Sequence, residues 1–151
     1  MIRSAYEKLR KKYNLPELNE LDSEFEISAI EHEESLLSNI RKKIIERLAF
    51  FVDALEPTVQ PTEAIVNVYE LRQLSESERN AAIEVYKKLM YWVRAAMETT
   101  AYADERKDAE FVKELFKQWP NLKKELISTF SRLKAVWKNE EKAKEENGYF
   151  W

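Results

Sequence analysis

Five acidic side chains in the N-terminal part of the chain are of the type that binds divalent cations. They lie at Glu31, Glu33, Glu34, Glu46 and Asp53. A hard cation such as Mg²⁺ takes several oxygen ligands that converge on one point, so the carboxylates must share a helical face. Glu31 and Glu34 do so, but Phe50 stands where a second pair with Asp53 would need an acid. A solvated acidic face is therefore favoured over a Mg-dependent site that processes nucleotides.

The single histidine, His32, lies between two of these acids. A di-iron site in a helical bundle needs two Glu-x-x-His motifs, and the chain has neither a second histidine nor the required spacing at the first. There is no cysteine to act as a nucleophile or a thiolate ligand. The sequence therefore predicts no metal site, no cofactor and no catalytic residue, and it places His32 on a solvent-exposed helix.

Lysines on one side of the last expected helix could neutralise phosphate groups. On a helical wheel these lysines lie beside a narrow apolar sector, and we call them the basic flank: Lys123, Lys124, Lys134 and Lys138. Residues 111–138 contain seven basic and two acidic side chains, whereas residues 14–35 contain eight acids and no Lys or Arg. The basic flank predicts contact with nucleic acid or the ribosome as an alternative function, because each lysine on a phosphate releases counterions. A solvated face, or a face covered by the acidic segment of the same protein, stays open.

Three consecutive aromatic residues, Tyr149, Phe150 and Trp151, follow a highly charged segment at residues 139–148. Each could bury ~150 to 250 Å² in a groove. Gly148 stands just before them, where a helix would end in a left-handed turn. We therefore expect these residues to bind a partner surface, either on the same chain or on another copy or protein.

The composition limits the class of protein. With one glycine, Gly148, in 151 residues, glycine-rich phosphate loops are excluded and tight hairpins are disfavoured, so helices carry the chain. Net charge is −3 with both signs abundant, which gives no general attraction to nucleic acid or to an anionic membrane. The absence of cysteine and of long apolar runs predicts a cytoplasmic protein without a membrane partner. Abundant Glu and Lys are typical of thermophilic proteins.

Helical periodicity predicts the elements that position these residues. The expected helices are residues 2–13, 23–56, 62–73, a long helix that begins with a Ser75–Glu78 capping box and frays or kinks near 99–105, one that ends at Pro120, and a last one through Trp137. Capping boxes at Ser23 and Ser28 leave the start of the second helix open by a turn, and Pro57 ends it. Residues 15–22 form an arm or a single turn. The predicted fold is a single all-α domain over residues 1–151, an irregular bundle of five or six helices with one or two long helices and a charged tail at 139–151.

Aromatic residues at helical spacing are expected in the core at Tyr86, Phe116, Phe130 and Trp137. Two adjacent pairs behave differently, because neighbours on one helix point in different directions. They are Phe50 with Phe51, and Tyr91 with Trp92. Each pair has to bury two sides of its helix, which predicts a central helix or a homo-oligomer.

Three segments, LPELNELDSEFEIS, SNIRKKIIERL and LSESERNAAIEVYKKLMYW, together resemble small uncharacterised all-helical proteins of archaea. The resemblance implies an archaeal cytoplasmic setting and brings no functional residue. From the residues themselves we expect a non-enzymatic interaction or assembly protein that self-associates or binds an unidentified protein.

Overall fold

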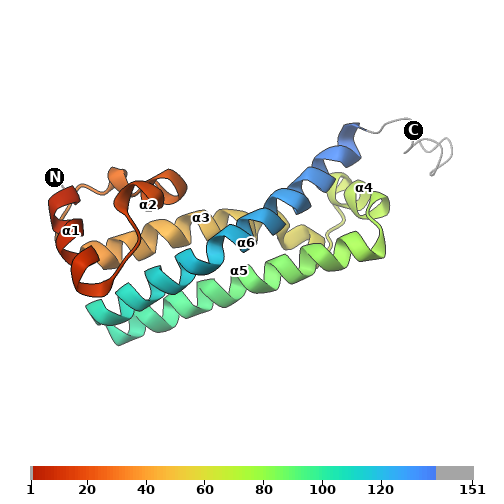
Figure 1. Ribbon diagram of the computed structural model, residues 1–151. Coiled ribbons are helices and arrows are strands. Elements are labelled where there is room, and N and C mark those ends of the chain that lie inside the picture. Colours follow the sequence, from red (N-terminus) through yellow and green to blue (C-terminus); the bar gives the residue numbers. More distant parts are fainter. Residues whose placement is uncertain (1, 139–151) are drawn as a thin grey trace. The chain divides into compact units, whose positions relative to one another are not determined.

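The computed structural model describes residues 2–138, and within them the chain is an all-α helical bundle without strands. Figure 1 traces the elements in order. They are α1 (Ile2–Tyr13), α2 (Leu18–Phe25), the 3-10 turn η1 (Ile27–Ala29), α3 (Leu36–Val59), α4 (Ile65–Gln73), α5 (Glu76–Tyr102) and α6 (Glu105–Lys138). The predicted fold class is confirmed, with three long helices of 24, 27 and 34 residues rather than one or two.

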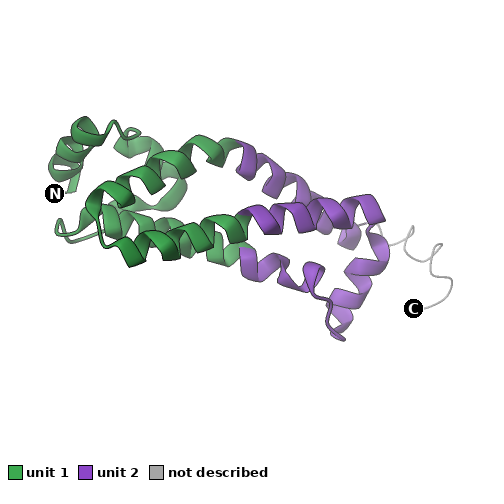
Figure 2. Cartoon of the chain, turned by 90° about the horizontal axis from the view of Figure 1, so that it is seen from below, with its two compact units in different colours: residues 1–51, 89–120 green, residues 52–88, 121–151 purple. Residues whose placement is uncertain are grey.

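The chain groups into two compact units, which Figure 2 colours separately. Unit 1 contains residues 1–51 and 89–120, and unit 2 contains residues 52–88 and 121–151. Helices α3, α5 and α6 each contribute one part to either unit. The single domain predicted from the sequence stays a prediction.

The N-terminal part of unit 1 is held by leucines and one tyrosine. Asn14 ends α1 in the left-handed conformation, and the N–H of Leu15 bonds to the carbonyl of Arg10, which is the Schellman pattern for a helix end. Leu15 is buried, as are Leu18 and Leu21 of α2, and the three leucines anchor this segment to the core. The predicted arm is in fact largely a helix. The buried Tyr6 hydroxyl donates to the carbonyl of Pro16, and burial raises the pKa of that hydroxyl.

The third helix begins later than the sequence predicts. Ser23 lies inside α2, where its hydroxyl bonds to the Glu20 carbonyl, and a left-handed Glu26 ends that helix. Helix α3 starts only at Leu36, so both predicted capping boxes are wrong. Phe25 and Ile27 are both buried although they would point to nearly opposite sides of one helix. The turn at Glu26 resolves this conflict.

Two prolines lie inside helices instead of ending them. Helix α3 continues past Pro57 to Val59, and α6 continues past Pro120 to Lys138, so both expected breaks are wrong. A proline lacks one N–H, which removes a single helical hydrogen bond. At Pro57 this loss falls in the last turn, and at Pro120 it falls on an exposed side of the helix where water can bond to the carbonyl.

In unit 2, a buried asparagine fastens α4 to the end of α3. The Asn67 side chain accepts from the N–H of Thr62 and donates to the carbonyl of Pro57 at 2.9 Å. Thr62 bonds to the N–H of Ala64 before the helix instead of capping its first turn. Because Asn67 takes the inward position, Ile65 is exposed.

The far end of α6 packs on α4 through aromatic rings, and Figure 1 shows the two elements side by side. The rings of Tyr69 and Trp137 are 4.5 Å apart between centroids. The indole N–H of Trp137 donates to Glu70 at 2.9 Å, and the Tyr69 hydroxyl donates to the Val136 carbonyl. Trp137 is therefore half-exposed and covers Tyr69 from outside, which corrects its predicted place in the core.

The start of α5 follows the sequence closely. The Ser75 hydroxyl accepts from the N–H of Glu78, and the Glu78 carboxylate accepts from the N–H of Ser75, so the predicted capping box is confirmed. The helix ends at Tyr102, within the segment where the sequence predicts fraying or a kink. Tyr86, which was expected in the core, is only half-buried, whereas Ala82 and Leu89 are buried and Met97 is exposed.

A few large side chains form the centre of the core. In unit 1, Trp119 is almost fully buried, packs on Phe25 at 5.1 Å between ring centroids and donates its indole N–H to Glu24. Phe116 and Phe130, both expected in the core, are only half-buried. The fully buried aliphatic residues on α3 are Leu37, Ile40, Ile44, Leu48 and Leu55.

The turn between α5 and α6 carries a strain that can be measured. Ala103 has φ 51°, a left-handed conformation that costs a residue with a Cβ about 1–2 kcal/mol. Replacing Ala103 by Gly removes this cost, and we expect the free energy of unfolding to rise by about 1 kcal/mol in urea denaturation. The matched control is Ala101→Gly, two residues earlier inside α5, which we expect to lower stability by about 0.5–1 kcal/mol. Equal effects of the two glycines would contradict this account of the turn.

Candidate protein-binding faces

Most of the predicted site residues lie on the surface, and some lie outside the described part of the chain. The aromatic residues Tyr149, Phe150 and Trp151 fall outside residues 2–138, as does the charged tail before them. His32 is exposed, as predicted, but it lies in the connection before α3 and not on a helix. The candidate acids beside it, at Glu31, Glu33 and Glu34, are exposed in the same connection.

Residues 2–138 contain no group of three or more His, Cys, Asp or Glu placed to hold a metal ion. The carboxylates expected on one helical face are separated, because Glu31 and Glu34 precede α3 while Glu46 and Asp53 lie within it. None of the helices in the described residues combines the length and apolar character needed to cross a bilayer.

The basic flank lies on the part of α6 that belongs to unit 2. Lys124, Lys134 and Lys138 are exposed, whereas Lys123 is half-buried and engaged with other groups. Arg132, which the sequence did not single out, is also exposed and shares a groove of about 410 Å³ with Lys124 and Glu125. The structure therefore places most of the flank where a partner can reach it.

A row of exposed residues on α5 forms an unusual surface in unit 1. The side chains of Tyr91, Met97 and Tyr102 are 66%, 56% and 56% exposed. At 100° per residue, Arg94 and Glu98 fall between them, and both are exposed. We call Tyr91, Arg94, Met97, Glu98 and Tyr102 the α5 face. Three large side chains exposed along 12 residues of one helix suggest a binding surface, since scattered single residues are the usual pattern.

The opposite side of α5 explains why these residues point outward. Leu89, Ala96 and Thr99 are buried on the inner side. Trp92 turns toward α6 and meets Phe111 edge to face, with ring centroids 6.0 Å apart, and Tyr91 packs against the outer edge of Trp92 at 5.2 Å. The predicted conflict within the pair is thus resolved by burying Trp92 partly and leaving Tyr91 exposed.

The polar side chains of the α5 face have few partners. Arg94 contacts the Met97 sulfur at 3.1 Å, and the ammonium of Lys107 lies over the Tyr102 ring at 4.8 Å. Within residues 2–138, neither Arg94 nor Glu98 forms an ion pair. One helix face therefore carries an unpaired base and an unpaired acid between two tyrosines.

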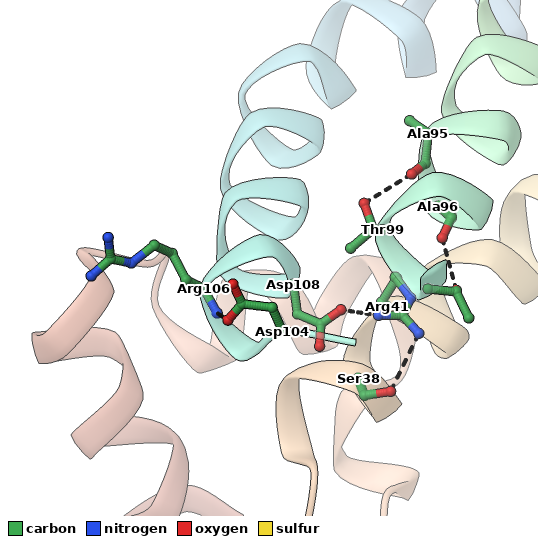
Figure 3. A network of polar contacts seen from close by, with 9 residues as sticks. Ser38, Arg41, Ala95, Ala96, Thr99, Asp104, Arg106 and Asp108 are labelled. Atoms are coloured by element: carbon green, nitrogen blue, oxygen red, sulfur yellow. Dashed lines mark hydrogen bonds and ion pairs between the residues drawn. The ribbon is translucent and has the colours of Figure 1, made fainter. Parts of the chain in front are cut away.

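A buried ion pair joins α3 to α6 in unit 1. Figure 3 shows the guanidinium of Arg41 pointing at the carboxylate of Asp108, with the Ser38 hydroxyl as a second acceptor at 3.3 Å. Arg41 and Asp108 are only 5% and 6% exposed. Burial lowers the pKa of the Arg41 guanidinium, because the charged form is desolvated.

A cleft of about 440 Å³ opens beside this pair, between the start of α3 and the turn from α5 to α6. Its acids are already engaged within the protein. Asp108 pairs with Arg41, Glu105 accepts from the Tyr13 hydroxyl, and Asp104 accepts from the N–H of Arg106. Asp108 and Glu105 join α6 to other helices and Asp104 caps the start of α6, so the cleft gives no basis for assigning a reaction.

The other predicted aromatic pair borders a second groove in unit 1. Phe50 is exposed and Phe51 is half-buried, with their ring centroids 5.5 Å apart and the Arg47 guanidinium over Phe51. The groove measures about 250 Å³ and also contains Glu46 and Lys43. As in the Tyr91–Trp92 pair on α5, one ring of this pair is partly buried and the other is exposed.

Comparison of the chain with models of protein families, with curated proteins and with solved structures gave no match. The functional interpretation therefore depends on the surfaces described above. The sequence indicated the basic flank and both aromatic pairs, but it missed the buried Arg41–Asp108 pair. The sequence does contain a signal for this buried pair, because Arg41 stands between Ile40 and Ile44 on the apolar side of its helix.

The buried pair makes a clear prediction for stability. Replacing Asp108 by Asn leaves the Arg41 charge buried without its counterion, and we expect the free energy of unfolding to fall by about 3–5 kcal/mol. Glu110→Gln, on the exposed side of the same helix, serves as the control and should change stability by less than about 0.5 kcal/mol. Chemical denaturation of both variants measures the difference. A loss below about 1 kcal/mol for Asp108→Asn would contradict the assigned role of the pair.

Proposed function

We propose that the protein is a non-enzymatic assembly protein that binds a second copy of itself through the α5 face. The observation that carries this proposal is the exposure of Tyr91, Met97 and Tyr102 on a helix whose other side is already buried. Tyrosine and methionine are enriched in the cores of protein interfaces. Covering them removes apolar surface from water, which favours association.

The order of charges on the α5 face fits a second copy of the same helix. In a two-fold symmetric pair, each residue faces a different residue of the partner, and the exchange is reciprocal. If two copies of α5 run antiparallel and cross level with residue 96, Arg94 faces the partner's Glu98 and Glu98 faces the partner's Arg94. Tyr91 then lies at the level of the partner's residue 101, beside the partner's Tyr102. The face is therefore complementary to itself in both charge and apolar surface.

The two ion pairs give the interface its register. Charge pairs near the rim of an interface add little affinity but suppress misaligned pairing, because like charges then stand opposite each other. A parallel arrangement of two α5 helices places Arg94 level with Arg94 and Glu98 level with Glu98. Charge thus supports the antiparallel pairing over the parallel one.

Charge reversal tests the proposal without removing apolar surface. Arg94→Glu places two acids opposite each other twice in each dimer, and we expect the dissociation constant to rise about tenfold. Glu98→Arg should have a similar effect. The double variant with both changes exchanges the charges and should restore the dissociation constant of the parent protein. Sedimentation velocity over a concentration series measures all four proteins.

A control at a half-buried arginine away from the α5 face is Arg79→Glu, on the part of α5 that belongs to unit 2. It changes the net charge as much as Arg94→Glu and should leave association unchanged. A parent protein that stays monomeric at micromolar concentration and above contradicts the proposal. So does a double variant that associates no better than either single variant.

A further inference from the structure

The basic flank contains an exposed apolar residue at its centre. Ile127 is 61% exposed on α6. On the helical wheel it lies between Lys134 and Lys138, and Lys123 stands one turn earlier on the same side. A lone isoleucine surrounded by lysines gives a surface with two components, one apolar contact and several positive charges. A partner that fits this surface needs an apolar group carried on an acidic segment.

Basic side chains outnumber acidic ones on this part of α6. Residues 121–138 contain five basic side chains and one acid, Glu125, which pairs with Lys88 at 2.6 Å. No acid within residues 2–138 pairs with Lys124, Lys134 or Lys138. The surface therefore has room for a negatively charged occupant.

The segment that follows α6 has the matching composition. Residues 139–151 carry four glutamates and two lysines, followed by Tyr149, Phe150 and Trp151. We propose that this segment of the same chain docks on the basic flank, with its glutamates against the lysines and its aromatic residues over Ile127. The proposal concerns unit 2 and does not depend on self-association through the α5 face.

The length of the segment allows it to fold back. Ile127 precedes Lys138 by 11 residues, so it lies about 16 Å back along the helix axis. Tyr149 follows Lys138 by 11 residues, which span up to roughly 36 Å when extended. A short connection of this kind gives an effective concentration on the order of millimolar, which favours docking on the same chain over docking on another copy.

Docking of this segment would control whether an anionic partner can reach the lysines of the basic flank. Lysines covered by glutamates cannot neutralise the phosphates of a nucleic acid at the same time. The C-terminal segment and an anionic macromolecule would therefore compete for one surface. High salt weakens the charge pairs and leaves the apolar contact with Ile127.

The absence of cysteine makes a direct test possible. Ser131→Cys, on the exposed side of α6 one turn after Ile127, accepts a single bimane label. Bimane fluorescence is quenched by a nearby tryptophan. We expect the labelled full-length protein to be quenched, and Trp151→Phe to increase its fluorescence. The quenching by Trp137 is the same in both proteins, so the difference reports Trp151 alone.

Two matched substitutions test the docking residue. Ile127→Asp should remove the Trp151-dependent quenching, because it replaces the apolar contact with a like charge. Ile65→Asp alters another exposed isoleucine of unit 2 and should leave the quenching intact. The proposed docking on the same chain also predicts quenching that does not change on dilution from micromolar to nanomolar concentration.

Four results would overturn the proposal. The first two are equal bimane fluorescence with and without Trp151, and quenching that is lost on dilution, which would indicate docking on a second copy. The third is quenching that responds to Ile65→Asp but not to Ile127→Asp. The fourth is an RNA oligonucleotide that binds the parent protein and a variant with Ala at positions 149–151 with equal affinity. The last result would assign the basic flank to nucleic acid, unhindered by the C-terminal segment.

Discussion

The scarcity of glycine constrains every turn in unit 1. The one glycine, Gly148, lies outside the described residues, yet four turns of unit 1 need a positive φ. Residues with a Cβ take these positions: Asn14, Glu26, Ser35 and Ala103. Asn14 tolerates the left-handed conformation, but Glu26 and Ala103 have no such preference. Asn14, Glu26 and Ser35 are each followed by a buried residue, namely Leu15, Ile27 and Leu36, whose packing holds the turn.

The turns determine where the buried charges meet. Ser35 immediately precedes α3, which places Arg41 near the start of that helix, and Ala103 reverses the chain so that α6 begins with Asp108 in its first turns. The Arg41–Asp108 pair then fixes α3 against α6. A buried charge pair contributes specificity of packing more than net stability, because desolvation of both groups offsets their attraction.

The fixed helices also decide which side of α5 faces outward. Trp92 packs against Phe111 of α6, and this contact leaves Tyr91 on the exposed side. Helical periodicity predicted α1, the Ser75 capping box and the long helix that follows it, because each depends on local signals. Periodicity could not choose between Tyr91 and Trp92, since the choice depends on a ring from a distant part of the chain.

The errors of sequence interpretation have similar causes. The expectation that Pro57 and Pro120 end helices used the local cost of a missing N–H, which is small where the lost bond lies in the last turn or on an exposed side of the helix. The expected helix from Ser23 runs through both Phe25 and Ile27, whereas the burial of both residues requires a turn between them. Ile127 was missed because an exposed isoleucine has no signature in sequence until its neighbours are placed.

The proposed function depends on one geometric claim, that two copies of α5 run antiparallel and cross level with residue 96. A nitroxide label at Ala101→Cys, on the exposed end of the helix, tests it by pulsed dipolar spectroscopy. In this arrangement the two labelled positions are separated by about ten residues of helical rise along the axis and by about 8–10 Å between the helices. These two offsets predict a distance of roughly 20 Å between the labels. A narrow distribution near that value supports the antiparallel pair. No dipolar coupling between copies at tens of micromolar, or a distance far from this value, would contradict it.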